Sequence, residues 1–138
     1  MKVWGDEAEM FEGDGYEGLA TAVMVSAVQR RKVPLILNVP NRGAIPQLRD
    51  TDVVEVTCMA DEHGVHPLAQ GSMPDEALAL IEPIKEYERL TVRAAVEGSY
   101  EAALKALLVH PLVGSYPLAK SILEDYLSAH SEFLSYVH

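Results

Sequence analysis

Apolar positions in the first half of the chain predict one helix and two strands. Between residues 17 and 31 apolar side chains fall on most sides of a helical projection, and basic residues close the segment, which suits the C-terminal end of a helix dipole. Short apolar runs at 34–39 and 52–59 predict strands, and the first run ends in a tight turn. Two strands do not form a stable sheet alone, so we expect them to pack on helices or on another sheet.

The second half of the chain has a helical pattern. Apolar residues spaced by three and four predict a long helix after Pro74, which Pro83 should kink or split and Gly98 should end. Ser99 predicts the cap of a shorter helix that reaches His110.

A last helix is expected to begin near Ser115 and Pro117. Its apolar side would consist of Leu118, Ile122, Tyr126 and Phe133. Together these elements predict an α+β fold in which helices dominate the second half.

Length and charge narrow the classes of function. A chain of 138 residues predicts a single domain over 13–138, preceded by a flexible acidic N-terminus over 1–12. The formal net charge of −10 argues against nucleic acid as a partner, because binding it requires a basic face. No apolar run is long enough to span a membrane, and the single cysteine, Cys58, fits a reducing cytoplasm.

Residues 13–18 read Gly-Asp-Gly-Tyr-Glu-Gly, the spacing of a dinucleotide-binding turn. Such a turn follows a buried parallel strand, but the preceding residues here are strongly acidic. The segment is therefore interpreted as a flexible loop that holds Tyr16 just before a helix. A phenol acts as a base only beside an activating group such as a helix N-terminus, a metal or a cationic cofactor. The neighbours Glu12, Asp14 and Glu17 disfavour a phenolate, so a structural role for Tyr16 stays open.

Three nearby residues, Cys58, His63 and His66, raise the question of a metal site. Their spacing matches none of the paired spacings of structural zinc, so no metal site is predicted in this chain. The interpretation that replaces a metal site is a buried Cys58 thiol beside a solvated loop over 61–67. The sequence also lacks a Gly-x-Ser-x-Gly elbow, and no pair of carboxylates stands out as a glycosidase pair.

Several ordered blocks resemble the C-terminal domain of glycoside hydrolase family 4. They are Asn-Val-Pro-Asn-Arg-Gly-Ala-Ile-Pro-Gln-Leu at 38–48, Val-Val-Glu-Val at 53–56, Gly-Val-His-Pro-Leu at 64–68, Lys-Glu-Tyr-Glu-Arg-Leu-Thr at 85–91, and later blocks at 103–107 and 110–113. The resemblance implies a fold like the C-terminal domains of lactate and malate dehydrogenases and of these glycosidases, with a small antiparallel sheet, several helices and no Rossmann domain.

The family implies an unusual chemistry, since it departs from the two-carboxylate rule. In these 6-phospho-glycosidases, α-glucosidases and α-galactosidases, NAD takes a hydride from sugar C3, a divalent metal stabilises the enediolate, and a tyrosine removes the C2 proton. Tyr16 occupies the position of that tyrosine, and Asn38, Asn41 and Arg42 are candidate substrate-binding residues. Family members often carry arginine where Pro40 stands, so a phosphate role for Arg42 stays open.

The N-terminal half of the family enzyme has no counterpart in this sequence. We therefore expect no cofactor in this chain, although NAD and manganese are expected in the complete enzyme. The resemblance implies the substrate-side and oligomerisation part of a 6-phospho-β-glucosidase-like enzyme, inactive alone, with an N-terminal nucleotide-binding domain or subunit, further copies of itself and a sugar or phospho-sugar as partners. The main alternative is a binding or interaction module that keeps only the scaffold, and a third is a free-standing metal protein that uses Cys58, His63 and His66.

Overall fold

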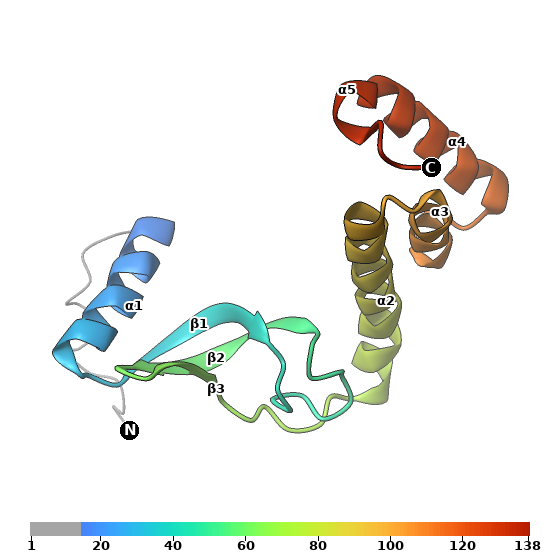
Figure 1. The fold of residues 1–138 in the computed structure, drawn as a ribbon. Coiled ribbons are helices and arrows are strands. Elements are labelled where there is room, and N and C mark those ends of the chain that lie inside the picture. The colour runs from blue at the N-terminus through green and yellow to red at the C-terminus, as the bar shows by residue number, and fades with distance from the viewer. Residues whose placement is uncertain (1–14) are drawn as a thin grey trace. The chain divides into compact units, whose positions relative to one another are not determined.

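The computed structural model describes residues 15–138. These residues divide into two compact units, and the boundary along the chain lies between Ser72 and Met73. The first unit holds α1 (Tyr16–Gln29), β1 (Val33–Pro40), β2 (Val53–Asp61) and β3 (Gly64–Pro67). The second unit holds α2 (Asp75–Glu97), α3 (Tyr100–Val109), α4 (Tyr116–Ala129) and α5 (Ser131–Leu134) (Figure 1). The α+β class predicted from the sequence is confirmed. The flexible terminus predicted over 1–12 lies outside the described residues, and the single domain predicted from length stays a prediction.

The three strands form an antiparallel sheet in the order β1-β2-β3. Alternate residues of β2 are buried, and Leu37 and Val39 of β1 lie opposite Val56 and Val54. One face of the sheet therefore carries the core of this unit. That core contains Ala44, Val54, Val56 and Cys58, with Leu37, Val39, Ile45, Leu48 and Val65 packed against it.

The third strand was not expected, because residues 61–67 were interpreted as a loop. Asp61 pairs with Gly64, so only two residues connect β2 to β3. A positive φ of 120° at Gly64 lets the chain reverse this sharply. The proline at 67 ends the strand, and it is an ordinary residue at the end of an edge strand.

Helix α1 packs on β1 and β2 and is buried only at Ala22 and Ser26 (Figure 1). It ends at Arg30, whose left-handed φ of 55° allows the backbone N–H of Arg31 to donate to the carbonyl oxygen of Ser26. The helix predicted at 17–31 is thus confirmed, with slightly different ends.

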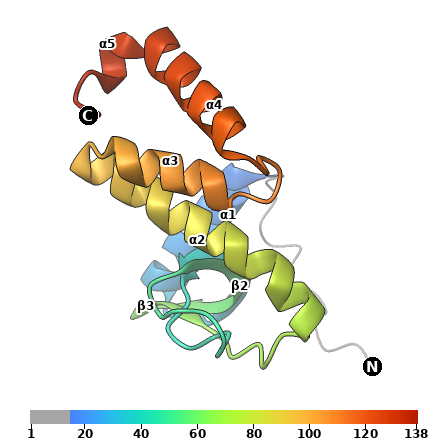
Figure 2. The same ribbon diagram turned by 90° about the vertical axis from the view of Figure 1, so that its right-hand side faces the viewer.

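In the second unit, α2 and α3 pack side by side and α4 follows α3 (Figure 2). The buried residues are mostly alanines, namely Ala94, Ala102, Ala106 and Ala119, together with Leu123. Small side chains at these positions let the helix backbones approach closely. The helices leave many of their larger apolar side chains exposed.

Two expectations for the helices are wrong in part. Pro83 does not split α2, which continues from Asp75 to Glu97, because a proline removes only one intrahelical hydrogen bond; a kink at Pro83 stays a prediction. The last helix does begin after a Ser115 cap, but it ends at Ala129, so Phe133 belongs to the separate α5.

Candidate functional site

Tyr16 is the first residue of α1 and is 92% exposed. Gly15 precedes it with a φ of 92°, a backbone conformation that favours glycine. The phenol therefore projects from the N-terminal end of a helix, where the dipole favours negative charge. The acidic residue Glu17 lies in the same first turn. Gly13 and Asp14 lie outside the described residues.

The loop between β1 and β2 begins with a turn at residues 41–44. The backbone N–H of Ala44 donates to the carbonyl oxygen of Asn41 at 2.8 Å, and the two central residues, Arg42 and Gly43, have φ values of 46° and 81°. Positive φ at both central residues is typical of a type I′ turn. A left-handed arginine is uncommon and places the Arg42 side chain outward, where it is exposed.

Asn41 is completely buried, and its amide is used by the loop itself. Its Nδ2 donates to the carbonyl oxygens of Ile45 and Leu48 at 2.9 and 3.1 Å, and its Oδ1 accepts from the N–H of Ile45 at 2.8 Å. Both hydrogens of Nδ2 and one lone pair of Oδ1 are therefore engaged within the loop. Asn41 shapes the loop from within.

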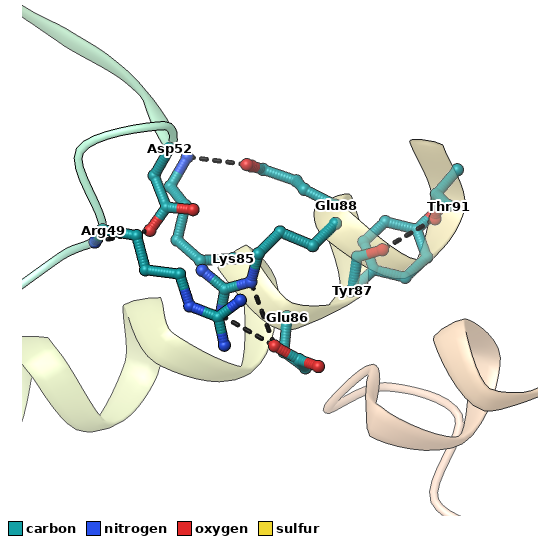
Figure 3. A network of polar contacts seen from close by, with 8 residues as sticks. Arg49, Asp52, Lys85, Glu86, Tyr87, Glu88 and Thr91 are labelled. Carbon is teal, nitrogen blue, oxygen red and sulfur yellow. Dashed lines mark hydrogen bonds and ion pairs between the residues drawn. The ribbon is translucent and has the colours of Figure 1, made fainter. Parts of the chain in front are cut away.

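The other end of this loop is held by Asp52, which is also buried. Its Oδ2 accepts a hydrogen bond from the backbone N–H of Arg49 at 3.1 Å (Figure 3). Its carbonyl oxygen accepts one from the N–H of Asn41 at 2.7 Å. The loop that presents Arg42 is consequently fixed at both ends.

Asn38 lies on the sheet face opposite the core, where it is exposed. Its partner across the ladder is Glu55, which is exposed as well. Residues directly opposite in an antiparallel pair have neighbouring side chains. The amide of Asn38 is therefore accessible beside a carboxylate, in contrast to that of Asn41.

Cys58, His63 and His66 do not form a metal site. Cys58 pairs with Pro67 and His66 pairs with Met59, so the thiol and the His66 ring point to opposite faces of the sheet. Cys58 is fully buried, its thiol donates to the carbonyl oxygen of Val56 at 3.3 Å, and burial raises its pKa. Within residues 15–138, no group of three or more histidines, cysteines or carboxylates is placed to hold a metal ion.

His66 instead pairs with Asp61, which the sequence did not reveal. The His66 Nε2 lies 3.2 Å from Asp61 Oδ1, which also accepts from the backbone N–H of His63 at 2.8 Å. The His63 hydrogen bond, and to a smaller extent His66, hold the pKa of the Asp61 carboxyl below its usual range. Only the two-residue connection between β2 and β3 brings these groups together.

Charged residues of the 85–91 block pair with one another along α2. Lys85 Nζ lies 2.7 Å from Glu88 Oε2, and the Thr91 hydroxyl donates to the carbonyl oxygen of Tyr87 at 2.8 Å (Figure 3). Arg89 pairs with Glu86 at 2.8 Å in the same way. Such contacts one helical turn apart support the helix and leave these charges largely compensated.

The described residues do not fit either cofactor of the family. The sheet of the first unit is antiparallel, whereas a dinucleotide is held after a buried parallel strand. Among residues 15–138 there is also no group of three or more potential metal ligands. The described helices also include none that is long and apolar enough to cross a membrane.

Comparison with known proteins gives the family context. Residues 3–113 match the model of the family 4 glycosyl hydrolase C-terminal domain. The probable 6-phospho-beta-glucosidase of Bacillus subtilis is 37% identical over 123 residues, which are 88% of this chain and 28% of that protein. The 6-phospho-beta-glucosidase of Thermotoga maritima is 42% identical over 99 residues, which are 72% of this chain and 24% of that protein.

Solved structures agree with the sequence relatives. The Thermotoga maritima 6-phospho-beta-glucosidase with manganese, NAD+ and glucose-6-phosphate has a TM-score of 0.78 at 38% identity, over 88% of this chain and 30% of that one. A 6-phospho-alpha-glucosidase from gut microorganisms with NAD and glucose-6-phosphate has a TM-score of 0.79 at 34% identity, over 90% of this chain and 28% of that one. The chain spans less than a third of these relatives, and it belongs to the C-terminal domain family of the family 4 glycosyl hydrolases.

Proposed function

We propose that this chain supplies the C-terminal, substrate-side part of a 6-phospho-β-glucosidase-like enzyme that cleaves O-glycosidic bonds by NAD-assisted oxidation and elimination. The observation that carries the proposal is Tyr16, 92% exposed at the start of α1 in a domain of this family. The Thermotoga maritima structure named above contains manganese, NAD+ and glucose-6-phosphate. Under this proposal, oxidation of the sugar belongs to the part of the enzyme that holds those cofactors.

The role proposed for Tyr16 is to accept the proton from sugar C2. Its exposure leaves the phenol oxygen accessible to a substrate bound outside this chain. Asn38 and Arg42 are proposed to contact the sugar or its phosphate, since both are exposed. Asn41 is proposed to act indirectly, by holding the loop that presents Arg42.

The cellular setting is part of the same proposal. A fully buried, unpaired cysteine fits the cytoplasm, where thiols stay reduced. Self-association is expected as well, because many large apolar side chains are exposed in the isolated chain.

The direct test measures release of nitrophenol from 4-nitrophenyl 6-phospho-β-glucoside with NAD and manganese. The chain alone should give no turnover, whereas its fusion to the N-terminal part of the Bacillus subtilis relative should be active. Tyr16→Phe in the fusion should lower kcat by at least about 100-fold, the usual contribution of a general base.

Tyr116→Phe provides a matched control, because Tyr116 is also the exposed first residue of a helix. A fusion that folds and binds glucose-6-phosphate without turnover would favour a binding module that keeps only the scaffold. Turnover by the chain alone would contradict the view that it is incomplete.

A further inference from the structure

Residues 136–138 follow α5 and connect back to the ends of two other helices. The backbone N–H of His138 donates to the carbonyl oxygen of Gly98 at 2.9 Å, and the carbonyl oxygen of His138 accepts from the N–H of Tyr100 at 3.2 Å. Gly98 caps the end of α2, and Tyr100 is the first residue of α3. Figure 2 shows the chain turning back from α5 toward this corner. We call residues 136–138 the strap.

The strap pairs with backbone groups that their own helices leave unpaired. The first N–H groups of a helix have no acceptor within it, and its last carbonyl groups have no donor. Tyr100 supplies such an N–H at the start of α3, and Gly98 supplies such a carbonyl at the end of α2. The backbone of a single strap residue, His138, therefore satisfies one group from each helix.

The strap also lies very close to the backbone of α2. Gly98 is buried and has a left-handed φ of 66°. A Cβ at this position would lie 2.5 Å from the carbonyl oxygen of Tyr136 and 3.1 Å from its Cδ2 atom. Glycine at 98 thus both ends α2 and leaves room for the strap.

Helices α4 and α5 bury few side chains of their own. Ala119 and Leu123 are the buried residues of α4, and no residue of α5, which the structure describes in full, is buried. Segments with few buried apolar side chains open at a lower free energy than the rest of a domain. The pair α4–α5 is attached to α3 by the turn at 110–115 and, beyond its other end, to the α2–α3 corner by the strap.

We propose that α4 and α5 form a hinged flap that opens as one unit, and that the strap is the latch that holds it closed. The turn at 110–115 is the hinge. Opening breaks both hydrogen bonds of His138 and exposes Ala119 and Leu123 to water, while α2 and α3 stay folded. This device lies within the helical unit and is independent of the role proposed for Tyr16.

Amide hydrogen exchange of the whole chain, followed by NMR, tests the flap. The N–H of Leu123 in α4 should exchange at least about tenfold faster than that of Ala106 in α3. Tyr100→Pro removes the N–H that donates to His138, and proline is well tolerated at the first position of a helix. Tyr100→Ala is its matched control, because it also loses the ring but keeps this N–H. The exchange rate of Leu123 should be about fivefold higher in Tyr100→Pro than in Tyr100→Ala, as expected for one lost hydrogen bond.

Lys105→Gly is a control for α3 itself, since Lys105 is exposed inside that helix. Glycine weakens a helix interior, so the exchange rate of Ala106 should rise about threefold while that of Leu123 stays unchanged. Equal rates for Ala106 and Leu123 in the wild type would overturn the proposal, and so would a rise at Leu123 in Lys105→Gly as large as that at Ala106. In either case α3 and α4 would unfold together.

Gly98→Ala disturbs the latch by a second route, through its contact with Tyr136. It should raise the exchange rate of Leu123 at least about fivefold, through overpacking. An unchanged rate in this variant, or equal rates in Tyr100→Pro and Tyr100→Ala, would overturn the role of the strap, because the flap would then stay closed without it.

Discussion

At the scale of single residues, two asparagines three positions apart have opposite surroundings. Asn41 is buried with three hydrogen bonds to loop backbone, whereas Asn38 is exposed on the outer sheet face. Both fit a sugar-binding motif in the sequence. Only the packing of the loop shows that the amide of Asn41 is already used.

Replacing Asn41 should therefore destabilise the protein. Asn41→Ala removes all three hydrogen bonds between the buried amide and the backbone of Ile45 and Leu48, so the free energy of unfolding should fall by at least about 2 kcal/mol. Urea unfolding followed by circular dichroism measures this, with Asn38→Ala as the control that changes stability by less than about 0.5 kcal/mol. Equal losses in the two variants would contradict the structural role.

Gly98 and Gly114 isolate the effect of a single close contact. Both have left-handed φ values, 66° and 67°, but a Cβ at Gly98 would lie 2.5 Å from the carbonyl oxygen of Tyr136, whereas a Cβ at Gly114 would meet nothing within 4 Å. Gly98→Ala should cost at least about 1 kcal/mol more than Gly114→Ala, through overpacking. Thermal unfolding of the two variants measures this difference. Similar Tm values would contradict the prediction, because the C-terminal segment around Tyr136 would then move away from residue 98 without cost.

The Asp61 carboxylate makes stability depend on acid pH. The pKa of this carboxyl is lowered in the folded protein, first by the N–H of His63 and then by His66. Its contribution to the free energy of unfolding is therefore fully present above the unfolded pKa of about 4 and is lost as the pH falls through the folded pKa. The urea midpoint of unfolding should accordingly decrease less for Asp61→Asn than for the wild type as the pH is lowered below about 4. Asp125→Asn, an exposed site on α4, should leave that slope unchanged.

At the scale of elements, caps were readable from the sequence because their chemistry is local. Ser99 accepts a hydrogen bond from the N–H of Ala102 at 3.2 Å and begins α3, as predicted. The split considered at Pro83 was wrong because the continuation of α2 depends on the whole helix. Strand β3 was missed because a four-residue edge strand exists only through pairing with β2.

The Ser99 cap offers a test at this scale. Ser99→Ala should lower the free energy of unfolding by about 1 kcal/mol, because the hydrogen bond to the first turn of α3 is lost. Ser99→Asp should keep most of the stability, since aspartate also caps helices. A loss as large for aspartate as for alanine would mean that the hydroxyl is needed for another reason.

At the scale of the whole molecule, the chain consists of two compact units joined by a segment with neither helix nor strand at 68–74. Most of that segment is exposed, and exposed irregular backbone is where proteases cut first. Elastase should cleave beside Ala69, and Ala69→Asp should slow this cut, as mass spectrometry of the fragments will show. A first cut elsewhere in residues 15–138 would contradict this. After a cut beside Ala69, circular dichroism of the two separated fragments tests the single domain predicted from length.

The sequence by itself determined the family, the α+β class, most helix ends and the position of Tyr16, because ordered motifs, helical spacing and caps are properties of neighbouring residues. Only the tertiary structure decided which side chains remain available. It buried Asn41, exposed Asn38, separated Cys58 from His66 across the sheet and left one side of α1 uncovered. Burial and register arise from contacts between residues distant in sequence, and a linear pattern does not contain those contacts.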